Sequence, residues 1–348
     1  MATDSVMWRE IQEQPDVIDR LVTSQQAAAE GLARALERRP ITHIVLAARG
    51  TSDNAARYAQ YLWGAMNGLV MALATPSLFT RYHRPPHLTN SLVLGLSQSG
   101  RSPDIVAVLE EARRQGALTA VVTNAPGSPL AAQADIVIDL CAGEERAVAA
   151  TKTYTAELAA IALACVTLSR DSDMLEALKR VPDAMAQALR VEASAKVAAD
   201  SLRQMHSAAV IGRGYNYSTA FELALKLQEL TYANTQAYSS ADFLHGPLAL
   251  VEPGFPVIGI AARGPLLADL RSLFDTLLER QAHLVCISDD PAAAPGARHV
   301  LPVPAGTPEW LTPLTLIIPG QLLALHLAVA RGGDVDAPRS IHKVTETY

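Results

Sequence analysis

Short continuous apolar runs alternate along this chain with longer stretches in which apolar residues recur every three or four positions. The short runs predict buried strands, and the longer periodic stretches predict amphipathic helices. The alternation covers residues 41–168, gives way to helical connector sequence over 171–197, and begins again at 207. Such alternation is typical of parallel sheets covered by helices on both faces, so we expect an α/β fold.

The pattern can be resolved into individual elements. In the first half we expect strands over residues 41–47, 70–74, 91–96, 117–123 and 136–140. The helices of that half are expected over residues 53–63, 103–114 and 151–168. In the second half we expect strands over 207–212, 257–261, 283–288 and 299–303, and helices over 217–232, 266–280 and 310–331. Two amphipathic helices are expected ahead of the first half, one over residues 6–21, with a break near Pro15, and one over 25–37.

The second half repeats the first. VLAARGTSDNAARYAQYL, from Val45 to Leu62, aligns with AVIGRGYNYSTAFELALK, from Ala209 to Lys226, and both contain an Arg-Gly pair after an apolar strand. An internal repeat predicts two related α/β units with pseudo-symmetry and a cleft between them. We therefore expect four segments: an N-terminal helical lead-in, a first domain, a second domain that carries a catalytic helix, and a C-terminal tail, over residues 1–30, 31–182, 183–331 and 332–348.

Composition narrows the class of protein. The 348 residues suffice for about two domains, and 49% hydrophobic content provides material for their cores. A net charge of −6 offers no basic surface for nucleic acid, and we find no uninterrupted apolar span of membrane length. The N-terminus is acidic and amphipathic, unlike a secretory signal. The three cysteines are scattered and show no metal spacing, so we expect reduced thiols, a cytoplasmic protein and no metal.

A hydroxyl-rich turn follows the predicted strand that starts at Ser91, in the sequence SLVLGLSQSGRSPD. Ser102 is expected to be the N-cap of the next helix, and Pro103 its first residue. A strand, a polar turn and a helix N-terminus together favour anion binding, because backbone N–H groups and hydroxyls donate toward one point. The turn could hold a phosphate without a lysine-rich pocket; an ordinary serine-rich turn is the alternative.

Charged residues on a predicted helix form a second candidate. Glu222, Lys226 and Glu229 are spaced to share one face, between residues that are mostly apolar. A solvated face with a supporting ion pair is the common meaning of this spacing. In buried surroundings, however, a carboxylate beside a lysine can act as a base toward carbon-bound protons.

Three further positions could contribute to chemistry. Ser52 is expected to be either a helix N-cap or a hydroxyl donor to a ligand. His245 lies in a short turn over residues 241–247, and Gly246-Pro247 after it favours a fixed side chain. Lys343 lies in the tail, where Ile341 and Val344 suggest packing that could bury it part-way and allow a Schiff base.

Together these segments resemble the SIS (sugar isomerase) family. The resemblance is greatest to the isomerase half of glucosamine-6-phosphate synthase and to the stand-alone glucosamine-6-phosphate deaminases of this fold. It covers nearly the whole chain, through WREIQEQPDVIDRL, RGTSDNA, LSQSGRSPD, TNAPGSPLAAQAD, AVAATKTYTAEL, GRGYNYSTAFELALKLQEL, LHGPLALVEPGFP and KVTE. It implies two tandem SIS domains, each a three-layer, flavodoxin-like parallel sheet, and no cofactor.

The resemblance also implies roles for individual residues. The phosphosugar-binding residues would be Thr51, Ser52, Ser97, Gln98, Ser99 and Ser102, with Val148, Ala150 and Thr151 lining the sugar through the backbone. The catalytic residues would be Glu229 as the base between C1 and C2, Lys226 at the sugar oxygens, His245 for ring opening and Lys343 as a closing residue that forms an imine. His245 would reach the site from a neighbouring subunit, which implies a homodimer.

Departures from the family pattern affect what we expect. Ala150 replaces a serine, Gln228 replaces a lysine, and Arg101 replaces an acidic residue of the phosphate turn. The sequence starts at the helix that leads into the first domain, without a cysteine nucleophile or a glutaminase domain. We therefore expect no release of ammonia from glutamine.

The leading hypothesis is an amino-sugar phosphate deaminase/isomerase that converts glucosamine 6-phosphate to fructose 6-phosphate and ammonia. One alternative is another SIS reaction, either aldose–ketose isomerisation of a different hexose phosphate or deglycation of a fructosamine phosphate. A non-catalytic phosphosugar sensor is the third, less favoured, because Glu229, His245 and Lys343 are all present.

Overall fold

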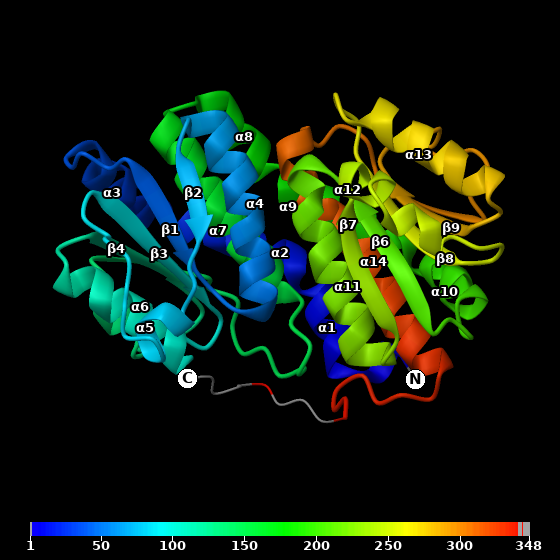
Figure 1. The fold of residues 1–348 in the computed structure, drawn as a ribbon, viewed down its shortest axis with the longest axis horizontal. Coiled ribbons are helices and arrows are strands. Elements are labelled where there is room, and N and C mark those ends of the chain that lie inside the picture. The colour runs from blue at the N-terminus through cyan, green and yellow to red at the C-terminus, as the bar shows by residue number, and fades with distance from the viewer. Residues whose placement is uncertain (1, 340–342, 344–348) are drawn as a thin grey trace. The chain divides into compact units, whose positions relative to one another are not determined.

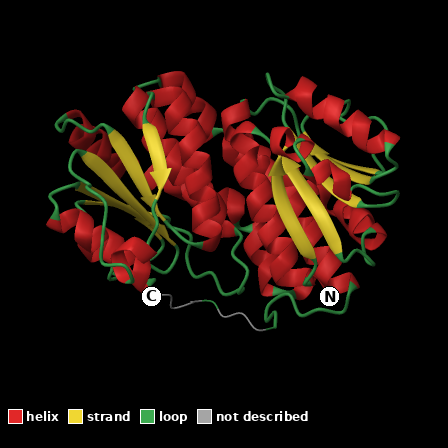
Figure 2. Ribbon diagram, viewed as in Figure 1, coloured by secondary structure: helices red, strands yellow, loops and turns green. Residues whose placement is uncertain are grey.

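Two parallel sheets organise the chain (Figure 1, Figure 2). The computed structural model describes residues 2–339 and 343. Within that part of the chain, residues 16–145 and 152–180, with Lys343, form one unit, called here the N-terminal unit. Residues 2–15, 146–151 and 181–339 form the other, called the C-terminal unit. Each unit contains one five-stranded sheet, as the alternating pattern predicts.

In the N-terminal unit the strand order is β2-β1-β3-β4-β5, and all neighbours are parallel. The strands are β1 (His43–Ala47), β2 (Val70–Leu73), β3 (Ser91–Ser97), β4 (Leu118–Thr123) and β5 (Ile136–Asp139). Its helices are α3 (Gln26–Glu37), α4 (Gly50–Asn67), α5 (Ser77–Thr80), α6 (Pro103–Arg114), α7 (Lys152–Ser169) and α8 (Ser172–Lys179). Helices α3, α4 and α7 pack on one side of the sheet and α6 on the other, giving three layers (Figure 1).

The C-terminal unit has the same order, β7-β6-β8-β9-β10. Its strands are β6 (Ser207–Gly212), β7 (Asn234–Ser239), β8 (Pro256–Ala261), β9 (His283–Ser288) and β10 (His299–Pro302). The helices are α1 (Val6–Gln12), α9 (Val181–Ala188), α10 (Glu192–Ser201), α11 (Tyr217–Thr231), α12 (Ser240–Leu244), α13 (Leu267–Glu279) and α14 (Thr312–Ala330). Short 3₁₀ turns of this unit span Ala2–Asp4, Leu189–Val191, Gly214–Asn216, Pro247–Leu250 and Glu309–Leu311. The helix α2 (Gln14–Ser24) follows α1 and lies mostly in the N-terminal unit, as does the 3₁₀ turn Ala131–Gln133.

The fold class predicted from the sequence is confirmed, with some local corrections. The predicted helix over 6–21 is two helices, because the first ends at Gln12 and the next begins at Gln14. The edge strand β7 and helix α12 were not predicted, and α12 occupies most of what we expected to be a turn over 241–247. Strand β7 lies at the edge of its sheet, and its sequence NTQAYS lacks the continuous apolar run from which the other strands were predicted.

Helix α14 corrects the expectation about apolar spans. Residues Glu309–Ala330 form a helical stretch long and apolar enough to cross a membrane by composition alone. In the structure, however, 89% of an apolar 18-residue window within that stretch is buried inside the protein. A helix that is apolar on all sides and buried by protein is a core helix, here in contact with α10 and α11.

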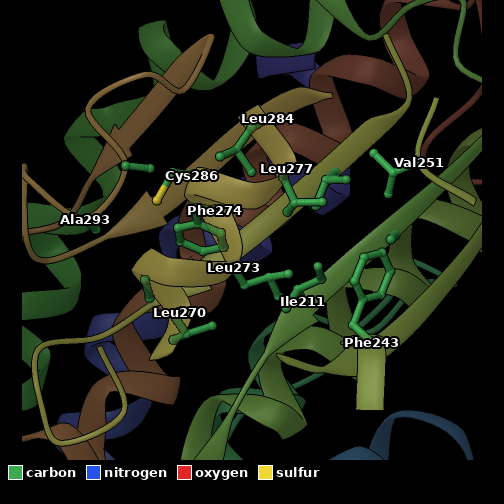
Figure 3. Packing of buried hydrophobic residues seen from close by; sticks show 14 of the residues in the cluster. Ile211, Phe243, Val251, Leu270, Leu273, Phe274, Leu277, Leu284, Cys286 and Ala293 are labelled. Atoms are coloured by element: carbon green, nitrogen blue, oxygen red, sulfur yellow. The ribbon is translucent and has the colours of Figure 1, made fainter. Parts of the chain in front are cut away.

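The core of the C-terminal unit shows how tightly helix α13 meets its sheet (Figure 3). Phe274 is fully buried among Ile211, Leu273 and Leu277. A Cβ added to Gly259, on β8, would lie 2.5 Å from the Phe274 ring. The ring therefore occupies the space that a larger residue would need.

We predict that Gly259→Ala destabilises the protein by about 1–3 kcal/mol, because protein interiors do not absorb an extra methyl group without displacement. Gly31→Ala is the matched control: it lies in helix α3, and nothing lies within 4 Å of its added Cβ. That control should be neutral or slightly stabilising. Urea denaturation of both variants tests the prediction, and equal midpoints would contradict it.

Candidate functional site

The hydroxyl-rich turn connects β3 to α6 in the N-terminal unit. Strand β3 ends at Ser97, Ser102 is the N-cap of α6, and Pro103 is its first residue, as predicted. The Ser97 hydroxyl accepts a hydrogen bond from Gly100 N at 3.1 Å, and the Ser99 hydroxyl accepts one from Arg101 N at 3.3 Å. These bonds fold the turn on itself, while the Ser102 side chain makes no capping bond to its helix.

The position of this turn in the sheet favours ligand binding. Strand β1 pairs with β2 on one side and β3 on the other, so the chain reverses direction of winding between β1 and β3. In open parallel sheets, ligands bind beyond the carboxyl ends of the strands at such a switch point. The turns after β1 and β3 both lie there, so the sheet brings the turn of Ser97–Ser102 beside the turn of Arg49–Ser52.

The turn after β1 differs from our expectation. Helix α4 begins at Gly50 with Arg49 as its N-cap, so the predicted N-cap role of Ser52 is wrong. Ser52 lies inside the first turn of the helix and donates a hydrogen bond to Glu157 Oε1 at 2.6 Å. Thr51 is half-buried, and burial raises the pKa of the neighbouring Asp53 despite Arg57 one helical turn later.

Arg49 is a residue that our sequence reasoning left out of the site. Its Nε lies 2.7 Å from Oδ2 of Asp104, and that carboxylate is almost fully buried in the first turn of α6. Half of the Arg49 side chain remains exposed, at 52%. The ion pair therefore fixes the Arg49 guanidinium at the edge of the hydroxyl-rich turn of Ser97–Ser102. The repeated Arg-Gly pair was the only signal in the sequence.

Helix α11 of the C-terminal unit carries the predicted charged face. Lys226 is completely buried, with its Nζ 3.4 Å from Glu222 Oε1 and 2.6 Å from Glu229 Oε2. Glu222 is also buried, whereas the Glu229 side chain is 23% exposed. The shared face predicted from the spacing is confirmed, and its outermost carboxylate reaches solvent. Gln228, on the exposed side, donates to the backbone oxygen of Thr235 on β7.

Three of the residues predicted to line the sugar lie in the segment of residues 146–151, which belongs to the C-terminal unit. Val148 and Ala150 are half-buried, and Thr151 is buried. The Thr151 carbonyl accepts a hydrogen bond from Gln321 Nε2 of α14 at 3.4 Å. The segment is therefore held at Thr151, while Val148 and Ala150 before it are partly exposed to solvent. Gln98, in the N-terminal unit, is likewise half-buried.

The two remaining catalytic candidates differ in their surroundings. His245 is exposed, directly after α12, and Gly246 beside it has a φ of 149°. Lys343 donates from Nζ to Glu145 Oε2 at 2.8 Å, and its side chain is 24% exposed. The predicted packing of Ile341 and Val344 lies outside the described residues.

Glu145 is a buried acceptor that the sequence did not single out. Its carboxylate accepts hydrogen bonds from Thr153 N at 3.1 Å and Thr153 Oγ1 at 2.7 Å, in addition to the Lys343 amine. The Lys343 amine is thus engaged in an ion pair in this structure. Within residues 2–339 and 343, no group of three or more His, Cys, Asp or Glu side chains is arranged to hold a metal ion.

Comparison with known sequences identifies the relatives of this chain. The SIS domain family matches residues 39–167 and 201–331. A glutamine–fructose-6-phosphate aminotransferase (isomerizing) of Symbiobacterium thermophilum is 34% identical over 355 residues, covering 97% of this chain and 58% of the relative. The chain therefore spans somewhat more than half the length of the curated relatives it matches.

Solved structures agree with the sequence comparison. A candidate phosphosugar isomerase from Silicibacter pomeroyi superposes with a TM-score of 0.86 at 33% identity, covering 95% of this chain and 100% of the other. The C-terminal domain of the Francisella tularensis glucosamine-fructose-6-phosphate aminotransferase gives 0.88 at 28% identity, with 96% and 98% covered. A Thermotoga maritima glucosamine-6-phosphate deaminase gives 0.77 at 19% identity, with 99% and 100% covered, which shows a shared fold. The chain belongs to the SIS domain family and contains two copies of that domain.

Proposed function

We propose that this protein is a phosphosugar isomerase of the deaminating kind, which converts glucosamine 6-phosphate to fructose 6-phosphate and ammonia. The observation that carries the proposal is the pair of Lys226 and Glu229 on α11, in which a buried lysine holds a partly exposed carboxylate. The names of the relatives support a phosphorylated sugar as substrate.

In this proposal the turn of Ser97–Ser102 binds the phosphate. Its hydroxyls and the backbone N–H groups at the start of α6 would donate to the phosphate oxygens, and the helix dipole favours the negative charge. Thr51 would contact neighbouring oxygens, and Ser52 would do so through its backbone N–H, because its hydroxyl donates to Glu157. The exposed half of Arg49 would add a positive charge at the rim. Residues Val148, Ala150 and Thr151 would line the sugar.

The chemistry would proceed through the open-chain sugar, after His245 assists ring opening. The Glu229 carboxylate would remove the proton from C2, and the electron pair would form a C1–C2 double bond as the aldehyde oxygen gains a proton. Glu229 would then return its proton to C1, leaving an imine at C2. Water would add to that imine, ammonia would leave, and fructose 6-phosphate would remain. Lys226 would stabilise charge on the sugar oxygens.

Lys343 would have to change its partner before its amine could attack a sugar carbonyl. An amine bound to Glu145 cannot also attack a carbonyl, because attack needs a free electron pair on nitrogen. We propose that Lys343 leaves Glu145 when an open-chain sugar binds. Between turnovers, Lys343 would return to its ion pair with Glu145.

Assembly and location complete the proposal. Since His245 is exposed, it is free to reach a neighbouring copy, which supports the expected homodimer. A reduced set of three cysteines supports a cytoplasmic location.

An isomerase that acts on another hexose phosphate, or a deglycase for fructosamine phosphates, is the second candidate. Ala150 favours it, because a methyl group in place of a hydroxyl removes one sugar contact, and Arg101 changes the charge of the phosphate turn. These candidates share Glu229 as the base and differ in whether nitrogen leaves the sugar.

Replacement of the base tests the mechanism. We predict that Glu229→Gln lowers turnover about a hundred- to ten-thousand-fold, because an amide cannot take the C2 proton. Affinity for glucosamine 6-phosphate, measured by calorimetry, should change little. Glu252→Gln, an exposed carboxylate in the same unit, is the control and should behave as wild type. Full activity of Glu229→Gln would exclude this assignment.

Replacement of a turn glycine tests the phosphate anchor. Gly100 has a φ of 62°, and its added Cβ would lie 2.0 Å from Ser128 Oγ. We predict that Gly100→Ala weakens sugar-phosphate binding about tenfold or more by displacing the turn, in addition to a backbone cost of about 1–2 kcal/mol. Gly116→Ala shares the positive φ, at 76°, but has open space, so it should lose stability and keep affinity. Equal affinities in thermal-shift titrations would contradict the assignment.

A substrate panel separates the candidate reactions. With glucosamine 6-phosphate we expect both release of ammonia and exchange of the C2 hydrogen with deuterated solvent, and neither with the N-acetylated sugar. Exchange without ammonia, on any hexose phosphate, would support the second candidate. Binding without exchange on the whole panel would indicate a phosphosugar sensor.

A further inference from the structure

Helix α1 contacts two segments of the C-terminal unit that are distant from it in sequence. At its N-terminus, the Asp336 carboxylate accepts hydrogen bonds from Val6 N at 2.8 Å and from Met7 N at 2.9 Å. Asp336 belongs to the tail that follows α14. In the middle of the same helix, Glu10 reaches the segment of residues 146–151.

Glu10 is a buried carboxylate, with only 3% of the residue exposed. Its Oε1 accepts a hydrogen bond from Arg146 N at 2.5 Å, and its Oε2 accepts one from Ala147 N at 3.3 Å. Two consecutive backbone N–H groups therefore donate to one carboxylate. Such charge-assisted bonds are stronger than neutral ones and fix the direction of the backbone that donates them.

The other end of this segment is also held. Gln321 Nε2 donates to the Thr151 carbonyl at 3.4 Å, and Gln321 Oε1 accepts from Gln14 Nε2 at 2.8 Å. Side chains of α14 and of the N-terminal helices thus bond both ends of residues 146–151. Between these ends lie Val148 and Ala150, the positions proposed to line the sugar.

Packing alone does not require a carboxylate at position 10. Met7 and Ile11 are fully buried and already anchor the helix through apolar contact. Burial of a charged group is costly unless its partners compensate for lost water. Among the partners of Glu10 are two backbone N–H groups at the start of the segment of residues 146–151, so its charge acts on the backbone that leads into the proposed sugar-lining residues.

We propose that Glu10 is a positioning residue for the sugar subsite, and that α1 couples this subsite to the C-terminal tail through Asp336. The inference rests on the proposed function, because the sugar-lining role of residues 148–151 is part of it. A shift of α1 on loss of the Asp336 bonds would move Glu10 and, with it, the backbone at Arg146 and Ala147. The start of the tail, at Asp336, and the segment of residues 146–151 are then ordered together.

The first test is Glu10→Gln, which keeps the size of the side chain and removes its charge. We expect KM for glucosamine 6-phosphate to rise about tenfold while kcat changes less than about threefold, since positioning affects binding more than proton transfer. Hydrogen exchange at the Arg146 and Ala147 amides should accelerate about tenfold or more. Glu13→Gln, an exposed residue directly after α1, is the matched control and should change none of these.

The second test adds Asp336→Asn and the double variant. If α1 couples the two contacts, the double variant should raise KM by less than the product of the single effects. Independent effects would overturn the coupling, and wild-type KM and exchange in a folded Glu10→Gln would overturn the positioning role. If Glu10→Gln does not fold, the effect of Asp336→Asn on exchange at Arg146 and Ala147 decides. A wild-type protein without activity on any phosphosugar would instead contradict the proposed function, while the exchange measurement would still report on Glu10.

Discussion

The buried ammonium of Lys226 is the interaction on which the candidate chemistry of this protein depends. A lysine amine without exposed surface keeps its positive charge when opposite charges lie beside it, and Glu222 and Glu229 supply them from the same helix. Removal of one partner from a buried pair typically costs about 3–5 kcal/mol, because the remaining charge is left without compensation. The requirement that the fold neutralise Lys226 therefore also fixes the carboxylate of Glu229 at the border with solvent. The ion pair with Lys226 thus orients the Glu229 carboxylate.

The parallel topology supplies the second constraint. Because both sheets have the same strand order, each has a switch point where two turns approach one another. In the N-terminal unit the two turns bring the hydroxyls of Ser97 and Ser99 beside an arginine that a buried carboxylate holds, Arg49 with Asp104. Donors contributed by backbone, hydroxyl and guanidinium can surround an anion from several directions. The sheet determines where this arrangement lies, and the sequence of the turns determines what it binds.

The sequence predicted those parts of the fold that local patterns determine. The β3–α6 connection was predictable because a continuous apolar strand, a proline and a serine each favour one structure, and helical spacing alone placed Lys226 beside Glu229. The start of α4 could not be predicted in this way. Its N-cap, Arg49, makes no side-chain capping bond, whereas serine, the residue type at position 52, is preferred at N-caps. The partner of Lys343 could not be predicted either. Glu145 lies 198 residues away, and only the tertiary fold brings the two together.

The internal repeat conserves backbone geometry more than chemistry. In the C-terminal unit, the turn after β8 corresponds to the serine turn, and residues 262–266 contain no hydroxyl. There the carboxylate of Glu309 lies against Gly264, close enough that an added Cβ would meet it at 2.5 Å. Burial and the nearby Asp289 raise the pKa of Glu309, which shows that its surroundings disfavour negative charge. An anion at this turn would meet a carboxylate in its place. The two units therefore share one strand order. The hydroxyl-rich turn lies in the N-terminal copy, and the buried Lys226 with its two carboxylates lies on α11 of the C-terminal copy.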